Sequence, residues 1–228
     1  MIGIIGAMQA EVEALQQQME QVTVSTISGV EFYRGVLWGQ DVVVAQCGIG
    51  KVFAAICAQT MILTYHPDCL INTGVAGGLT TDLGVGDITV ATTLVQHDMD
   101  TSPFGDPVGL ISGINVVHFP ADETVSALLA TAARSVNCRV KQGTIVSGDQ
   151  FISDPAKKEQ LHKGFDAVAC EMEGAAIAHV CYVNKTPFAV LRAISDSASG
   201  DGAMEYTEFM KLAAECSTKT ILAFCQEA

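Results

Sequence analysis

The sequence contains few charged residues, few aromatic residues and few basic ones. Of its 228 residues, 16% are charged and 6% are aromatic, whereas 49% are hydrophobic. Intrinsically disordered chains have the opposite balance, so we expect a folded globule. The 12 Lys and Arg residues form no basic run and stand against 25 Asp and Glu residues, which gives a net charge of −13. Nucleic-acid binding is therefore not expected, because it relies on clustered Lys and Arg that displace counterions from phosphates.

Three further features are missing. No run of 18 or more apolar residues occurs, so we expect no transmembrane helix and no membrane partner. The first residues lack the basic segment of a secretory signal peptide, and Glu11 and Glu13 follow too early for one. The eight cysteines are scattered without a CxxC pair, which favours reduced thiols over disulfides or a zinc site. Together these absences predict a cytoplasmic protein.

Short apolar segments alternate with segments of helical periodicity. Strands are expected at residues 2–5, 31–37, 41–46, 69–72, 88–95, 140–146, 167–171 and 188–194. Helices are expected at residues 10–19, 51–65, 122–136, 155–162, 174–184 and 207–226. A hairpin turn is expected at Trp38-Gly39-Gln40. This alternation predicts one α/β domain over residues 1–228, a three-layer α/β/α sandwich with a central mixed, mostly parallel sheet.

Ligands of such sheets bind at the carboxyl ends of the strands, where the loops supply the chemistry. The expected ligand-side segments are 6–11, 47–50, 73–78, 147–152, 171–173 and 195–206. Gly3 and Gly6 lack the third glycine of a dinucleotide fingerprint, and Lys51 is not followed by the Ser or Thr of a P-loop. A metal site at His97-Asp98-Met99-Asp100 is also disfavoured, because it contains a single histidine. The residues therefore indicate neither a dinucleotide fingerprint nor a P-loop, and we expect no metal at this loop.

Two carboxylates directly follow one of the apolar strands, in Cys170-Glu171-Met172-Glu173-Gly174. A single glutamate here would be an ordinary acidic residue at a helix N-terminus. Glu171 and Glu173 would share one side of an extended strand end, with Met172 on the other. A carboxylate in that position can accept hydrogen bonds from vicinal hydroxyls such as those of a ribose.

A second acidic group ends another strand, in Arg192-Ala193-Ile194-Ser195-Asp196. Arg192 and Asp196 either form an ordinary ion pair or leave Asp196 as a proton donor, its pKa raised by burial and by nearby carboxylates. Glu11 places a further carboxylate on the ligand side. Two carboxylates across a small ligand suit acid/base cleavage of a glycosidic bond, and Phe151 at a strand end would stack on a flat heterocycle.

Eight segments in order resemble bacterial 5′-methylthioadenosine/S-adenosylhomocysteine nucleosidases, which belong to the nucleoside phosphorylase superfamily. The match is collinear and runs from Met1 into the last expected helix. The segments are Ile4-Ile5-Gly6-Ala7-Met8 with Glu11, Gly48-Ile49-Gly50-Lys51, Asn72-Thr73-Gly74, Ala76-Gly77-Gly78, Ser147-Gly148-Asp149, Phe151-Ile152, Glu171-Met172-Glu173 and Arg192-Ala193-Ile194-Ser195-Asp196.

The resemblance implies a nucleoside phosphorylase-like fold, a homodimer, and a hydrolase that needs no cofactor. Its substrates would be the adenine nucleosides 5′-methylthioadenosine and S-adenosylhomocysteine, with 5′-deoxyadenosine and 6-amino-6-deoxyfutalosine as further candidates. The products would be adenine and the 5-substituted ribose, in methionine salvage and quorum sensing. Val75 stands where the family usually has a hydroxyl residue, and together with Gln96-His97-Asp98 it is similar to members that accept aminodeoxyfutalosine.

The resemblance also implies roles for individual residues. Asp196 would protonate adenine N7 with help from Ser195, and Glu11 would activate the attacking water with Arg192 near it. Glu173 would hold the ribose hydroxyls. The other substrate contacts would be Phe151 stacked on adenine, the Ile152 backbone at its edge, Met172 under the ribose, Ala76 and Gly77 in the glycine-rich turn, and Met8, Ile49, Tyr206 and Phe104 around the 5′-alkylthio group, with Phe104 from this subunit or its neighbour.

Two other functions remain open from the sequence. One is a purine nucleoside phosphorylase or a futalosine-type hydrolase of the same fold, and the other is a non-catalytic nucleoside-binding protein. Glu11 favours hydrolysis over phosphorolysis, because an anion beside the nucleophile repels phosphate and activates water. The presence of both Glu11 and Asp196 argues against binding alone, which would not need the two together.

Overall fold

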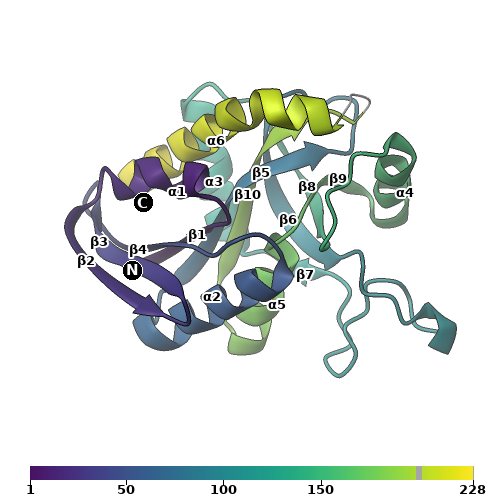
Figure 1. Cartoon of the computed structure of the whole chain (residues 1–228), viewed down its shortest axis with the longest axis horizontal. Coiled ribbons are helices and arrows are strands. Elements are labelled where there is room, and N and C mark those ends of the chain that lie inside the picture. Colours follow the sequence, from purple (N-terminus) through teal and green to yellow (C-terminus); the bar gives the residue numbers. More distant parts are fainter. Residues whose placement is uncertain (199–201, 228) are drawn as a thin grey trace.

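The computed structural model describes residues 1–198 and 202–227 of the chain. Its strands form one ten-stranded sheet in the order β10-β6-β8-β9-β5-β1-β4-β3-β2, with β7 beside β6 (Figure 1). The strands are β1 (Ile2–Gly6), β2 (Glu20–Ile27), β3 (Val30–Leu37), β4 (Gln40–Gln46), β5 (Cys69–Gly78), β6 (Ile88–Gln96), β7 (Phe119–Pro120), β8 (Val140–Ser147), β9 (Ala167–Glu171) and β10 (Phe188–Asp196). The helices are α1 (Gln9–Gln16), α2 (Lys51–Tyr65), α3 (Glu123–Ser135), α4 (Pro155–Phe165), α5 (Gly174–Asn184) and α6 (Gly202–Glu227), with a 3-10 turn η1 (Ser102–Phe104).

Helices cover both faces of the sheet, as the sequence predicts. Alternating side chains of β1 enter different cores: Ile4 packs with α1, α3 and α6, and Ile5 packs with α2 and α5 (Figure 1). α4 packs beside β8 and β9. The mixed three-layer α/β/α architecture is therefore confirmed, with a larger antiparallel share than expected, since β10–β6, β5–β9, β2–β3, β3–β4 and β6–β7 all pair antiparallel.

Part of the sheet closes on itself. β10 pairs with both β6 and β5, and the path β6-β8-β9-β5 completes a ring of five strands. One edge of β5 pairs with β1 over Cys69–Asn72 and then with antiparallel β9 at Gly77 and Gly78. The carboxyl ends of β1 and β9 therefore approach each other along this edge from opposite directions. Such a change of neighbour is where ligands bind in α/β sheets.

Several element boundaries differ from the sequence expectation. The hairpin turn is confirmed: Trp38 and Gly39 have φ values of 51° and 85° between β3 and β4, the left-handed pair that a tight two-residue hairpin requires. The prediction of a turn at residues 73–78 is wrong, because these residues belong to β5, which continues to Gly78. β2 is missed altogether, because nearly all of its side chains are exposed and leave no alternating pattern.

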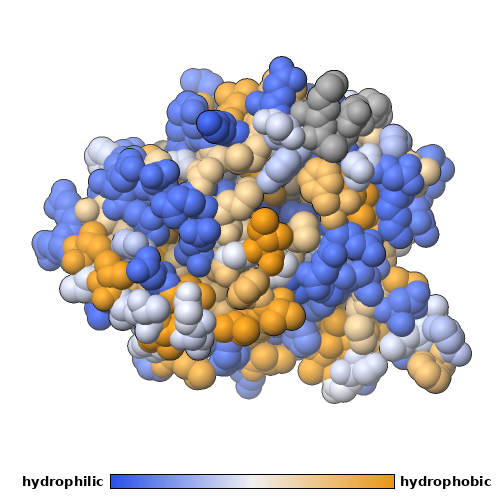
Figure 2. All heavy atoms as spheres, in the orientation of Figure 1, coloured by the Kyte–Doolittle hydropathy of each residue, from blue (hydrophilic) through white to orange (hydrophobic). Residues whose placement is uncertain are grey.

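The described residues include no helix long and apolar enough to cross a membrane. Apolar side chains nevertheless gather on one outer face, over α2 (Figure 2). They come from the helix and the residue preceding its N-cap, and they are 41–69% exposed: Ile49, Val52, Phe53, Ile56 and Leu63. A stripe of this kind on one helix is larger than the scattered apolar exposure of an ordinary surface.

Candidate active site

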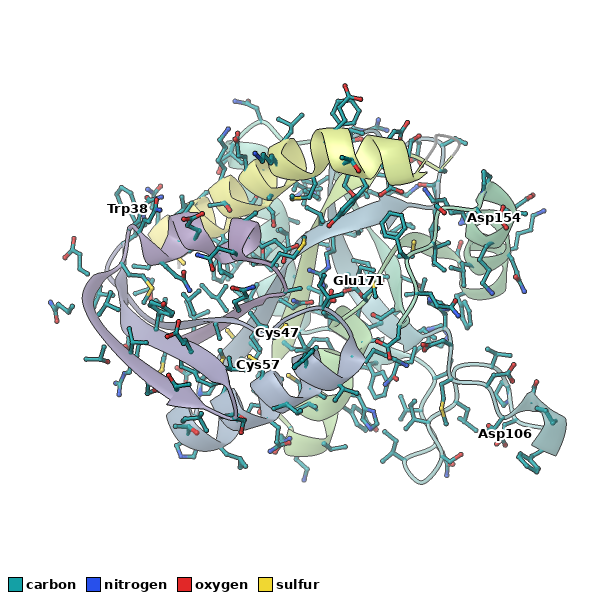
Figure 3. All side chains as sticks on the ribbon, in the orientation of Figure 1. Trp38, Cys47, Cys57, Asp106, Asp154 and Glu171 are labelled. Atoms are coloured by element: carbon teal, nitrogen blue, oxygen red, sulfur yellow. The ribbon has the colours of Figure 1, made fainter. Side chains whose placement is uncertain are left out.

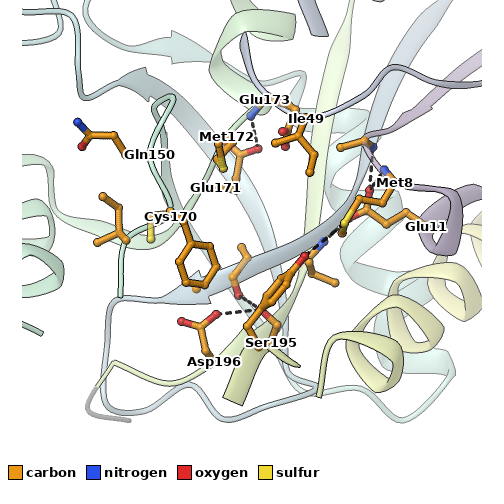
Figure 4. Close-up of a pocket in the computed structure, with 17 residues that line it drawn as sticks. Met8, Glu11, Ile49, Gln150, Cys170, Glu171, Met172, Glu173, Ser195 and Asp196 are labelled. Carbon is orange, nitrogen blue, oxygen red and sulfur yellow. Dashed lines mark hydrogen bonds between the residues drawn. The ribbon is translucent and has the colours of Figure 1, made fainter. Parts of the chain in front are cut away.

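A cavity of about 280 Å³ opens where β1 and β9 end beside β5 (Figure 4). This volume is close to the roughly 300 Å³ at which small-molecule sites begin. Except for Cys170, all of its lining residues lie in the six ligand-side segments expected from the sequence, the last of which includes residues 199–201, outside the described residues. The lining consists of Ala7, Met8, Glu11, Ile49, Val75, Ala76, Gly77, Gln150, Phe151, Ile152, Cys170, Glu171, Met172, Glu173, Ser195, Asp196 and Tyr206.

Glu11 is fixed by backbone N–H groups on two sides. It occupies the first turn of α1, and its Oε2 accepts hydrogen bonds from the N–H groups of Ala7 at 2.7 Å and Met8 at 2.9 Å. Its Oε1 accepts from the N–H of Val75 on β5 at 3.1 Å. The side chain is 2% exposed, and this burial raises the pKa of Glu11, with Arg192 and the three N–H groups acting in the opposite direction. The result is a rigid carboxylate whose pKa lies above that of an ordinary Glu.

Glu173 faces the same cavity from the end of β9. Its Oε1 accepts from the N–H of Gly50 at 2.8 Å, and its Oε2 lies 3.6 Å from Arg192 Nη2. Burial, with a second contribution from the charge of Glu171, raises the pKa of Glu173 to about 7. The cavity therefore holds a carboxyl group that gains and loses its proton near neutral pH.

Glu171 has a different role from Glu173, although the two were expected to share one side of a strand end. Its oxygens accept from Ser147 Oγ, from Arg192 Nη2 and from the N–H groups of Glu173 and Gly174 at 2.9 and 2.8 Å. Figure 3 places Glu171 at the centre of the molecule. With its oxygens satisfied by the protein, Glu171 anchors the turn that carries Glu173.

Arg192 lies behind the cavity and is completely buried. Its guanidinium binds Glu171 and the Asn72 Oδ1 at 2.5 Å. A Cβ on Gly74 would lie 2.5 Å from Glu11 Oε1 and would also collide with Arg192, so the glycine is required for this approach. The ion pair between Arg192 and Asp196, one of the two interpretations of the sequence, is wrong, because Arg192 pairs with Glu171 at the end of β9 and with Glu173 just beyond it.

Asp196 ends β10, where the Ser195 hydroxyl donates to its Oδ1 at 2.9 Å. A Cβ on Gly77 would come within 2.9 Å of Oδ2, so this glycine of β5 makes room for the carboxylate. The sequence predicts that carboxylates surround Asp196. In the structure, the ammonium group of Lys158 contacts it instead, with Nζ 2.6 Å from Oδ2. Sequence reasoning missed Lys158, although a lysine three residues before the buried Leu161 of α4 is an irregularity in that helix's apolar face.

Aromatic and apolar side chains cover the rest of the cavity (Figure 4). The rings of Phe151 and Tyr206 meet edge to face with centroids 5.3 Å apart, and the Tyr206 hydroxyl lies 3.3 Å from the sulfur of Met8. Ile49, Ile152 and Met172 complete this surface. Flat heterocycles and thioethers are the ligand groups that such a surface accommodates.

Of the site residues expected from the sequence, two are not in the lining of this cavity. Arg192 stands behind it, as described above. Phe104 belongs to η1 and is 88% exposed, on a loop that projects away from the body of the protein near Asp106 (Figure 3). The remaining expected residues are brought together by α1, β5, β10 and α6 and by the loops that follow β1, β4, β8 and β9.

Comparisons with known proteins agree over the whole chain. The family model of the phosphorylase superfamily matches residues 1–226. The 5′-methylthioadenosine/S-adenosylhomocysteine nucleosidase of Shewanella piezotolerans is 40% identical over 227 residues, which cover 99% of each chain.

Solved structures show the same similarity. The 5′-methylthioadenosine/S-adenosylhomocysteine nucleosidase of Neisseria meningitidis, in complex with methylthio-immucillin-A, has a TM-score of 0.95 and 38% identity, with 100% of this chain and 99% of that chain covered. The futalosine hydrolase of Helicobacter pylori has a TM-score of 0.94 and 36% identity, with 100% and 97% covered.

Proposed function

Since this chain belongs to the phosphorylase superfamily and, within it, to the 5′-methylthioadenosine/S-adenosylhomocysteine nucleosidases, we propose that Glu11 and Asp196 are its two catalytic residues. The chain is an N-glycosyl hydrolase: it hydrolyses the N-ribosidic bond and releases adenine and the 5-substituted ribose. The observation that carries our assignment is the charge of the cavity. Among the described residues that line it, four are acidic and none is Lys, Arg or His.

Asp196 acts on the base. Adenine is a poor leaving group as an anion, and protonation at N7 allows it to leave neutral. The Asp196 carboxyl group, positioned by the Ser195 hydroxyl at 2.9 Å, delivers this proton. Phe151 stacks on the adenine, and the Ile152 backbone contacts its edge; both residues line the same cavity as Asp196.

Glu11 acts on the water. Its carboxylate takes a proton from the water as the oxygen attacks C1′, and burial raises its pKa towards the range in which a general base works best. The three N–H groups that hold it keep the carboxylate aimed at one place. Val75 contributes one of them through its backbone, so the hydroxyl usual at this position is not needed to orient Glu11.

Glu173 binds the sugar. Its carboxylate accepts hydrogen bonds from the ribose 2′- and 3′-hydroxyls, while Met172 packs under the ring. An oxocarbenium-like sugar carries positive charge, which a cavity with four acidic side chains stabilises. Met8, Ile49 and Tyr206 surround the 5′-alkylthio group, and Ala76 and Gly77 form the floor contributed by β5.

Hydrolysis is favoured over phosphorolysis because the described part of the lining contains no cation to hold phosphate. The direct test is chromatography of the products formed from 5′-methylthioadenosine with and without inorganic phosphate. We expect adenine and free 5-methylthioribose in equal amounts in both buffers. A sugar 1-phosphate that forms only with phosphate would overturn the role of Glu11.

The assembly we propose is a homodimer built on the apolar face of α2. The five side chains that form this face are 41–69% exposed in the single chain, and the loop with Phe104 would reach the cavity of the neighbouring subunit. Light scattering after gel filtration tests the dimer.

Replacing Phe104 by alanine should raise KM for 5′-methylthioadenosine and leave adenine binding unchanged. We also propose that this reaction serves methionine salvage and quorum sensing in the cytoplasm.

A second candidate substrate is 6-amino-6-deoxyfutalosine. The observation that favours it is the similarity to the Helicobacter pylori futalosine hydrolase at 36% identity and a TM-score of 0.94, together with Val75 beside Glu11. The test is a comparison of kcat/KM for this compound, 5′-methylthioadenosine and 5′-deoxyadenosine. A ratio below about one hundredth for aminodeoxyfutalosine would remove it as a substrate.

A further inference from the structure

A buried lysine stands behind the carboxylate that we assign as the acid. Lys158 of α4 donates from Nζ to Asp196 Oδ2 at 2.6 Å and to the Ser197 carbonyl oxygen at 2.6 Å. The side chains of Lys158 and Asp196 are 1% and 2% exposed. Within the described part of the chain, Asp196 belongs to the cavity lining and Lys158 does not. The ammonium group therefore reaches the carboxylate from the side away from the substrate.

An ion pair in this position is not what the fold requires. The cost of taking two charges out of water offsets much of their attraction, and apolar side chains of similar volume often serve a protein interior equally well. The other buried side chain of α4 is Leu161, one turn further along the helix. Lys158 thus puts a charge on the buried face of α4, and within the described residues its Nζ donates to the acid and to the carbonyl group that follows it.

The pair also decides where the catalytic proton comes from. A carboxylate that accepts from the Lys158 ammonium and from the Ser195 hydroxyl has no proton of its own to give to adenine. Resting on the proposed role of Asp196, we infer that Lys158 is a positioning residue that supplies this proton through Asp196. The two side chains then act as one acid, with a single transferable proton.

One proton crosses the pair in each turnover. The Nζ–H bond of Lys158 breaks as the Asp196 carboxylate takes up the proton, and the carboxyl O–H bond breaks as the N7–H bond forms. The electron pair of the bond between C1′ and N9 moves into the adenine ring, and the water oxygen bonds to C1′ while Glu11 takes the water proton. Lys158 ends as an amine and Glu11 as a carboxylic acid. The proton returns from Glu11 to Lys158 through solvent after the products leave.

Other titratable groups near the pair do not obscure its effect on the pH profile. Burial raises the pKa of the Cys170 thiol on β9 to about 12, and burial also raises the pKa of the Tyr206 hydroxyl on α6. Both stay neutral between pH 5.5 and 8.5. Glu205 binds the Ser197 backbone and hydroxyl. Glu11 and Glu173, across the cavity, are present both in the wild type and in a Lys158 variant. Their ionisation therefore affects both enzymes, and the ratio of variant activity to wild-type activity at each pH reports on the pair of Lys158 and Asp196.

The test compares Lys158→Gln and Lys158→Arg with the wild type in adenine release from 5′-methylthioadenosine between pH 5.5 and 8.5. Glutamine keeps a hydrogen-bond donor but carries no proton to transfer. We expect its kcat to fall tenfold or more at pH 7.5, with KM within threefold. The deficit should shrink at pH 5.5, because the higher proton concentration lets solvent supply the proton that the side chain at position 158 no longer carries. Arginine keeps the charge but does not give up a proton, so its kcat should also fall at least tenfold. Lys163→Gln, an exposed lysine on the same helix, is the matched control and should behave as the wild type.

Three results would overturn the inference: a normal or raised kcat in Lys158→Gln, a deficit that is equal at every pH, or a normal kcat in Lys158→Arg. Thermal unfolding of each variant shows whether it is folded, and the arginine variant carries the test if the glutamine variant is not. Asp196→Asn is measured in parallel. If Asp196→Asn is inactive while both Lys158 variants are normal, the inference fails alone; if Asp196→Asn remains active, the proposed function of Asp196 fails as well.

Discussion

Replacing Glu173 by glutamine should make the protein's stability less dependent on pH. In the folded protein, burial and the neighbouring Glu171 raise the pKa of Glu173 from 4.5 to about 7. A carboxyl group with a raised pKa in the folded state stabilises the fold below its unfolded pKa, and this contribution is lost as pH rises through the folded pKa. At about 1.4 kcal/mol for each pKa unit, the loss between pH 5 and 8 is roughly 2–3 kcal/mol.

The assay is urea unfolding of the wild type and Glu173→Gln at pH 5, 6, 7 and 8, at one protein concentration. Glutamine cannot ionise and can still accept from the Gly50 N–H, so the variant should gain roughly 2–3 kcal/mol relative to the wild type between pH 5 and 8. Glu13→Gln, at an exposed position on α1, is the control and should run parallel to the wild type. If the free energies of unfolding of Glu173→Gln and the wild type differ by the same amount at every pH, the raised pKa of Glu173 is refuted as the cause of the pH dependence.

Three further predictions concern the site and the scaffold. Glu11→Gln should lower kcat for adenine release by a factor of roughly 10²–10⁴ with little change in KM, and a normal rate would contradict water activation. Gly74→Ala should lower the free energy of unfolding by about 1–3 kcal/mol, because its Cβ would lie 2.5 Å from Glu11 Oε1. Its matched control is Gly164→Ala in α4, which has open space around it and should raise the free energy of unfolding by about 0.5–1 kcal/mol. Asp122→Ala should lose roughly 0.5–2 kcal/mol in urea unfolding, since its side chain accepts from the Val125 N–H at the start of α3; unchanged stability would argue against that cap.

The parts of the fold that could be predicted from the sequence are those whose periodicity reflects burial. β9 and β10 consist mostly of apolar residues, and every position in them is buried; the Trp38-Gly39 turn has a strong local preference. β2 could not be found, because an exposed edge strand has no buried face to leave a pattern. The sequence predicts that this strand ends at Asn72, because glycines usually end a strand, but β5 continues to Gly78 and its Gly74 and Gly77 make room for Glu11 and Asp196.

Much of the cavity was predictable because its side chains follow strand ends. Glu11, Glu173 and Asp196 each come within a few residues of the carboxyl end of a strand, and the order of the sheet brings those ends together. Lys158 could not be placed in the same way, because it lies within a helix and reaches Asp196 across 38 residues of sequence. The projection of Phe104 away from the cavity likewise depends on the path of a long loop rather than on a repeating pattern.

The measurement that most directly tests the assignment of the acid is adenine release by Asp196→Asn, with adenine binding to the same variant measured by calorimetry. Asparagine preserves the shape of the side chain but has no acidic proton for N7. We predict that release from 5′-methylthioadenosine falls by at least a factor of roughly 10², while the variant remains folded and still binds adenine. Release at close to the wild-type rate by a folded variant would contradict protonation of the base by Asp196.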